Sequence, residues 1–246
     1  FGPVKYSALP ELLPIEKLTS GNAYVEVGTF IAILIGTISG GHLVSLEHGE
    51  YYVIGFLVFN SLAGYLFSRA VPAMKIADPA IMLELNPVRP TIETLKASHA
   101  NKTVFNSILG ISWFWFLGAV ILSLLPTITR QILNGNEHVV TVFLATFTIG
   151  IAAGAVLCEK LSFERVEIGL VPLGSIGMTI FLVDMGLVLS HWSSPTSFAT
   201  ALTAREFLSS SAAIHLLFDL FGIAVAGGIF TVPLYTLVQQ RSEREN

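Results

Sequence analysis

Six long apolar runs, separated by shorter polar segments, set the pattern of this chain of 246 residues. Runs near 20 residues match the ~30 Å hydrocarbon core of a bilayer at a helical rise of 1.5 Å per residue. They are too long, and alternate too little, for the strands of a membrane barrel. The pattern therefore predicts an all-α, polytopic transmembrane helical bundle. The expected spans are residues 23–46, 51–71, 104–128, 139–157, 168–189 and 210–238.

The longest polar segment, residues 72–103, divides these spans into two groups. We expect three parts: residues 1–71 with two spans, residues 72–103 as a connector loop, and residues 104–246 with four spans. Residues 87–99 of the connector fit either an amphipathic helix on the membrane surface or a solvated helix. Because the first residue is not a methionine and the last residues are charged, the sequence is expected to be a piece of a longer protein.

The composition indicates a membrane protein, and the motifs that are absent from the sequence exclude several classes of function. Hydrophobic residues make up 53% of the chain and charged residues 12%, with a mean hydropathy of +0.72. Soluble domains carry about 25% charged residues. The sequence shows no spaced metal ligands, no nucleophile triad, no phosphate-binding glycine loop and no basic patch for nucleic acid. We therefore expect a protein that is not an enzyme, has no cofactor or metal, binds no nucleic acid and contacts membrane lipid.

Basic residues fall almost entirely on one side of the membrane when the six spans alternate. Of the 13 Lys and Arg residues, only Arg130 and Arg205 fall on the other side. Cytoplasmic loops of membrane proteins carry the excess of Lys and Arg. The long connector is therefore expected to be cytoplasmic, in a multi-pass protein of the plasma membrane.

Small residues recur every four positions in two of the spans. This spacing places them on one helix face, where another backbone can approach closely. The two sets favour two helices packed face to face, either as plain close packing or as a sliding interface between two halves. The sets are Gly28, Ala32, Gly36 and Gly40 in the first span and Thr146, Gly150, Gly154 and Cys158 in the fourth.

Ionisable residues inside a bilayer are costly and usually functional. Asp219 lies about ten residues into the last span, roughly 15 Å deep, and His215 shares its helix face one turn earlier. This pair, with Gly222 at helical spacing, fits a water-filled path for a substrate or ion, or a structural hydrogen bond. We expect Glu26, at the mouth of the first span, to act as a gate or to anchor a loop, and Asp184 to serve helix packing.

The third span adds neutral candidates for the same path. Asn106, Gly110 and Trp113 share one helix face. The rings of the aromatic run at residues 113–116 cannot all face one way. We expect Phe114 and Trp115 to meet lipid.

Several segments resemble the major facilitator superfamily. Leu9–Gly41 resembles the loop after that family's fourth helix together with its glycine-rich fifth helix, although the family's proline is absent here. GAVLCEKLSFERVE, residues 154–167, is similar to a degenerate second-half copy of the family's loop between helices two and three. More narrowly, KYSALPELL, GNAYVEVGTFIAILIGT and FTVPLYTLVQQRSE resemble the bacterial lysophospholipid transporter branch, which includes chains fused to an acyltransferase.

The resemblance implies that the chain covers helices five to ten of a twelve-helix fold, in which the seventh and tenth helices line a central cavity. It implies a secondary transporter of the bacterial inner membrane that works by alternating access and moves lysophospholipids for re-acylation by a fused or associated acyltransferase. Two alternatives stay open: an efflux pump for small amphipathic compounds, and a non-transporting membrane anchor of a fused acyltransferase. The path residues would be Asn106, Gly110, Trp113, His215, Asp219 and Gly222, and the gating or inter-half residues Glu26, Gly28, Ala32, Gly36, Gly40, Thr146, Gly150 and Gly154.

Overall fold

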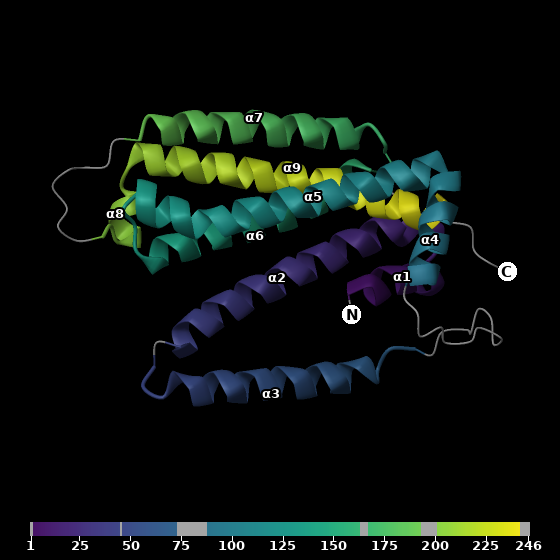
Figure 1. The fold of residues 1–246 in the computed structure, drawn as a ribbon, viewed down its shortest axis with the longest axis horizontal. Coiled ribbons are helices and arrows are strands. Elements are labelled where there is room, and N and C mark those ends of the chain that lie inside the picture. Colours follow the sequence, from purple (N-terminus) through teal and green to yellow (C-terminus); the bar gives the residue numbers. More distant parts are fainter. Residues whose placement is uncertain (1, 45, 73–87, 163–166, 193–200, 242–246) are drawn as a thin grey trace.

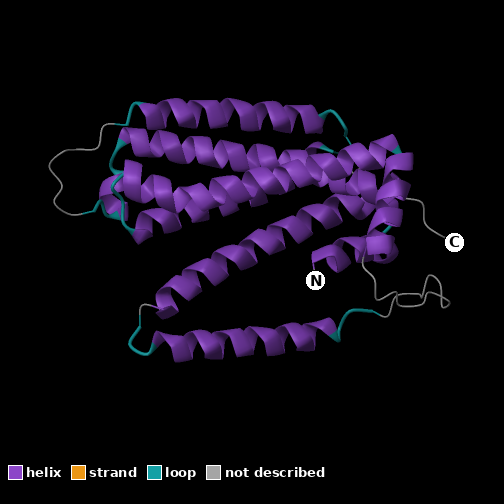
Figure 2. Cartoon of the chain, viewed as in Figure 1, coloured by secondary structure: helices purple, strands orange, loops and turns teal. Residues whose placement is uncertain are grey.

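The computed structural model describes residues 2–44, 46–72, 88–162, 167–192 and 201–241. The regular structure of these residues is helical, apart from an isolated bridge between Gly135 and Leu202 (Figure 2). Among them, six helices are long and apolar enough to cross a membrane. The expected all-α polytopic bundle is therefore confirmed.

Each of the six expected spans corresponds to one long helix. Their ends differ from the expected ones by a few residues. The helices are α2 (Leu18–Val44), α3 (Gly49–Ser68), α5 (Lys102–Thr127), α6 (Glu137–Leu161), α7 (Leu170–Ser190) and α9 (Ser211–Arg241). Asn101 and Asn136 cap the starts of the third and fourth spans, which are α5 and α6. The side-chain oxygen of each accepts hydrogen bonds from two backbone N–H groups of the first turn.

Short helices lie at the two ends of the bundle (Figure 1). α1 (Gly2–Leu12) and α4 (Val88–Ala100) lie at one end, and α8 (Ala204–Leu208) lies at the other. We call these the α4 end and the α8 end. A helix expected within the connector is present as α4, and the ring of its His99 packs edge-on against Phe105 of α5.

α9 lies at the centre of the bundle, packed mainly on α6 and α7 and also on α5 and α2 (Figure 1). Close approach of backbones makes this position possible. A Cβ atom at Gly154 of α6 would strike the backbone oxygen of Val225, and one at Gly228 of α9 would lie 2.7 Å from the backbone oxygen of Ile151. Glycine is needed at both positions because the two helix backbones touch there.

The two sets of small residues do not face each other. Gly150 and Gly154 of α6 pack on α9, so α9 already occupies the small-residue face of α6. α2 does pack on α6, but through larger side chains, such as Phe30 edge-on to Phe147. The predicted face-to-face packing is therefore wrong. On α2, added Cβ atoms would meet nothing within 4 Å at Gly28, Gly36 and Gly40.

α2 joins the other helices through its first half. Its buried residues all lie between Leu18 and Phe30, and beyond them α2 diverges from α6 and α9 (Figure 1). At this junction a small apolar core joins α2, α6 and α9. Its members are Ala23, Ala155, Cys158, Ile229 and Val232.

α3 runs antiparallel to α2 and, apart from Gly49, none of its residues is buried (Figure 1). Among the described residues, helices α1–α3 thus meet helices α5–α9 at the α4 end and in the middle of the bundle. The described contacts between the two groups do not extend to the α8 end.

Candidate functional site

Three ionisable side chains meet between α7 and α9: Asp184, His215 and Asp219. His215 Nε2 lies 3.0 Å from Asp184 Oδ2 and 3.8 Å from Asp219 Oδ2. Asp184 lies near the end of α7 and His215 near the start of α9. Consecutive antiparallel helices bring such positions to the same depth, so the fold itself assembles the group. We call these three residues the α7–α9 triad.

Burial differs sharply within the α7–α9 triad. The side chain of Asp219 is 0% exposed, and neither carboxylate oxygen has a hydrogen-bond partner among the described residues. The side chains of His215 and Asp184 are 48% and 46% exposed. The triad is therefore exposed at His215 and Asp184. On its other side lies the buried Asp219 carboxylate, which has no hydrogen-bond partner among the described residues.

This geometry changes the expected roles of the three residues. His215 and Asp219 share a face, as predicted, but the close partner of His215 is Asp184. Asp184 does link α7 to α9, which agrees with its expected role in helix packing. The sequence pattern does not reveal this group, because Asp184 lies 31 residues from His215. Equal depth in consecutive spans was the signal that could have found it.

The neutral path candidates do not share one surface. Asn106 is exposed and Trp113 is 58% exposed, but a Cβ atom at Gly110 would lie 2.8 Å from Leu234 of α9. Gly222 of α9 packs against the ring of Phe181 of α7. The two glycines therefore serve helix packing, while Asn106 and Trp113 remain available to a partner or ligand.

Phe114 was expected to meet lipid, and that prediction is wrong. Its side chain is 5% exposed and its ring lies against Gly227 of α9. Gly110 and Phe114 are one turn apart, so both lie on the face of α5 that α9 covers. Trp115 is 40% exposed and donates a hydrogen bond of 2.9 Å from Nε1 to the hydroxyl of Tyr235.

A second polar site lies at the α4 end, around Glu26. Glu26 is 1% exposed, and its Oε1 accepts a 2.8 Å hydrogen bond from the hydroxyl of Tyr6 in α1. The Tyr6 ring stacks on Tyr235 of α9, with 4.1 Å between ring centroids. Burial, followed by the nearby Glu26 carboxyl group, raises the pKa of Tyr6 well above its usual range. Tyr6 therefore keeps its proton and remains a donor.

Two amides continue this site. Asn22 Nδ2 of α2 donates to Gln239 Oε1 of α9 at 2.6 Å, and Gln239 Nε2 donates to the backbone oxygen of Tyr6 at 2.9 Å. Asn22 and Thr236, another partner of Asn22 at 3.2 Å, are both 0% exposed. The sequence reasoning missed these residues because neutral amides near span ends carry no signal of their own.

The α4-end network, defined as Tyr6, Asn22, Glu26, Tyr235 and Gln239, ties the first group of helices to the second. Its hydrogen bonds join α1 to α2, α2 to α9 and α9 to α1. Ser20 of α2 adds a 3.0 Å hydrogen bond to Glu159 of α6. Buried polar bonds of this kind hold one arrangement firmly and leave unsatisfied groups when it opens. Glu26 thus lies buried where the two groups of helices meet.

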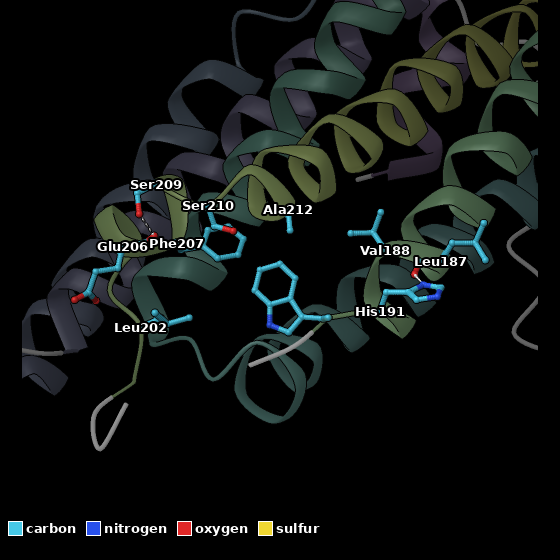
Figure 3. Close-up of a pocket in the computed structure, with 10 residues that line it drawn as sticks. Leu187, Val188, His191, Leu202, Glu206, Phe207, Ser209, Ser210 and Ala212 are labelled. Carbon is cyan, nitrogen blue, oxygen red and sulfur yellow. Dashed lines mark hydrogen bonds between the residues drawn. The ribbon is translucent and has the colours of Figure 1, made fainter. Parts of the chain in front are cut away.

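A cavity of about 730 Å³ lies at the α8 end, lined by the end of α7, by α8 and by the start of α9 (Figure 3). Val188 and Phe207 are among its apolar lining residues. Thr203 begins α8 with a reciprocal cap, and its backbone and hydroxyl bonds to Glu206 lower the pKa of that carboxyl group. Asp184 and His215 lie about one helical turn along their helices from the lining residues Leu187 and Ala212.

Comparison with known proteins gives one consistent result. The chain is 27% identical over 248 residues to "Lysophospholipid transporter LplT" of Cronobacter sakazakii, covering 99% of this chain and 56% of the relative. The proteins of that name from Shigella dysenteriae serotype 1 and Escherichia coli K12 are each 27% identical over 250 residues, with the same coverage. No family model and no solved structure matches the chain.

The chain spans about half the length of the curated relatives it matches. The match nevertheless covers nearly every residue of this chain, including both groups of helices. The resemblance that the sequence segments indicated is therefore confirmed: the chain is similar, along its whole length, to bacterial proteins named lysophospholipid transporters.

Proposed function

We propose that this chain is part of a secondary transporter that moves lysophospholipids across the bacterial inner membrane by alternating access. The observation that carries the proposal is the match of 99% of the chain to proteins named lysophospholipid transporters. Six helices able to cross a membrane support it. An acyltransferase, fused or separate, would re-acylate the imported lysophospholipid. This partner is proposed because a lysophospholipid lacks one acyl chain.

The arrangement of the helices supports alternating access. Residues 1–71 would end one transporter half, residues 72–103 would connect the halves, and residues 104–246 would begin the other. The α4-end network holds α1 and α2 against α9, while α2 diverges from α6 and α9 beyond Phe30. We infer a state closed at the α4 end. Breaking this network would let the halves rock.

The α4 end is proposed to face the cytoplasm. Nearly all the described basic residues lie at this end, among them Lys17, Lys102, Lys160 and Arg241, whereas Arg130 and Arg205 belong to the α8 end. The positive-inside rule assigns the basic end to the cytoplasm. A state closed at the α4 end would then be open towards the outside, where it would receive lysophospholipid.

The two chemical parts of a lysophospholipid suit two kinds of surface on this chain. A polar headgroup needs ionisable partners, which the half-exposed Asp184 and His215 offer near the α8 end. A single acyl chain needs apolar surface, and the exposed side chains of Trp113 and Phe116 offer this on α5. Asn106 would add a neutral polar group on the same helix.

Uptake of labelled lysophosphatidylethanolamine into spheroplasts tests the proposal, with the intact protein that carries this chain. We expect uptake above that of empty cells, and a fall of at least tenfold in Asp219→Asn, which keeps the shape of the side chain. Glu137→Gln is the matched control, because Glu137 is an exposed acidic residue at the α8 end outside the triad.

The opposite results separate the alternatives. Uptake equal to that of empty cells would overturn lysophospholipid import. Export of a cationic dye by the same cells would then favour an efflux pump, and the absence of both uptake and export would favour a membrane anchor. Equal uptake by wild type and Asp219→Asn would remove Asp219 from the path while leaving lipid import in place.

A further inference from the structure

We propose that Asp184, His215 and Asp219 bind a divalent transition-metal ion of the zinc class between α7 and α9. The proposal is independent of the transported substrate. It rests on three ligand atoms from two helices, all within 4.8 Å of one another. It rests equally on the buried Asp219 carboxylate, which is aimed into this group and has no hydrogen-bond partner among the described residues.

The spacing of the ligand atoms is close to that of a metal site. Bonds of about 2.0–2.1 Å in a tetrahedral site place neighbouring ligand atoms about 3.3 Å apart. His215 Nε2 lies 3.0 Å from Asp184 Oδ2 and 3.8 Å from Asp219 Oδ2, on either side of that value. His215 and Asp219 are one turn apart on α9, a spacing at which two side chains of a helix reach one ion. Small rotamer changes would complete the geometry.

Charge argues for a cation in the same place. The triad brings together two carboxylates and one imidazole, and the only Lys or Arg of α7 and α9 is Arg241, at the opposite end of α9. A carboxylate buried without a hydrogen bond is costly. Within the triad, the group that could carry a positive charge beside Asp219 is His215, whose Nε2 is 3.8 Å away and is shared with Asp184. A bound dication would balance both carboxylates at once.

The donor set selects the class of ion. Calcium and magnesium prefer sites made of oxygen ligands, whereas an imidazole nitrogen with carboxylate oxygens suits zinc and its neighbours. Three protein ligands leave a coordination position open. The exposed sides of Asp184 and His215 make that position accessible from outside the helix pair.

Zinc binding to the intact, tag-free protein in nanodiscs tests the proposal. Titration calorimetry and elemental analysis after gel filtration are expected to give one tightly held Zn²⁺ per chain. Asp219→Asn and His215→Gln should each lower the affinity more than tenfold. Co²⁺ should bind at the same stoichiometry with visible d–d absorption, which His215→Gln removes.

His138→Gln is the matched control, because His138 is exposed at the start of α6 and lies outside the triad. It should keep wild-type affinity. The proposal is overturned if wild type binds no Zn²⁺, or if His215→Gln binds it as tightly as wild type. Because the His215 side chain is half exposed, this variant should fold even where Asp219→Asn does not. Lipid uptake is not part of this measurement, so failure here leaves the proposed transport untouched.

Discussion

The rings of Tyr6 and Tyr235 stack face to face, with 4.1 Å between centroids and 3° between planes, although they come from opposite ends of the chain. The hydroxyl of Tyr6 also donates a hydrogen bond to the buried Glu26. One side chain of the short helix α1 therefore contacts both groups of helices. The α4 end is held by a specific polar contact as well as by apolar packing.

Tyr6→Phe separates the two contributions of this residue. The ring stack remains, but the buried Glu26 loses its donor, so we expect a loss of about 1–3 kcal/mol of stability. Thermal unfolding in detergent would show a lower midpoint for Tyr6→Phe than for wild type. Tyr24→Phe is the control, since Tyr24 is 70% exposed. An unchanged midpoint for Tyr6→Phe would show that the hydrogen bond adds no stability.

Phe114→Ala and Trp113→Ala should differ although the residues are neighbours. Phe114 is 5% exposed and Trp113 is 58% exposed. Truncating a buried aromatic ring costs about 3–5 kcal/mol, whereas an exposed substitution changes stability by about 0.5 kcal/mol or less. The yield of folded protein after heating would rank Phe114→Ala well below Trp113→Ala. The reverse order would mean that α9 does not cover this face of α5.

Glycine substitutions should distinguish static packing from a moving interface. Gly154→Leu should abolish folding, because even a Cβ atom there would strike the backbone of Val225. Gly36→Leu meets open space in this state and should leave the unfolding midpoint unchanged or raised. If the halves rock, Gly36→Leu should still lower lysophospholipid uptake. Normal uptake by this variant would exclude a moving contact at Gly36.

Acid should loosen the cap of α8. Glu206 accepts the backbone and hydroxyl hydrogens of Thr203, and these bonds lower its pKa in the folded protein. A lowered pKa adds stability above the ordinary value of about 4.3, and this stability is lost as the pH falls through the folded value. Hydrogen exchange of the α8 amides, corrected for intrinsic rates, should accelerate at acidic pH. Glu206→Gln should lack this dependence, and an identical pH profile for both proteins would contradict it.

Sequence reasoning recovers the six helices because apolar length alone defines a span. It does not predict which face of each helix packs against another helix and which face meets lipid. In lipid, a side chain that meets a neighbouring helix and one that meets an acyl chain are equally apolar, so periodicity does not distinguish them. Phe114 shows the result: it was assigned to lipid, but its side chain is buried against α9.

Single polar residues were more informative than their pairings. Glu26 and Asp219 were identified from their depth in a span, and both side chains are buried at polar contacts or clusters. The partners of these residues are harder to predict from the sequence, because the pairing depends on which helices pack together. Tyr6 and Asp184 come from other segments, and only the packed fold brings them to Glu26 and His215.

Cys158 gives the junction of α2, α6 and α9 a chemical consequence. It is the only cysteine of the chain, and its side chain is 0% exposed in the apolar core shared by those three helices. A thiol reagent is excluded while α2 stays in place. Any movement that separates α2 from α6 and α9 uncovers the sulfur, so the rate of Cys158 alkylation reports this separation without an engineered cysteine in this chain.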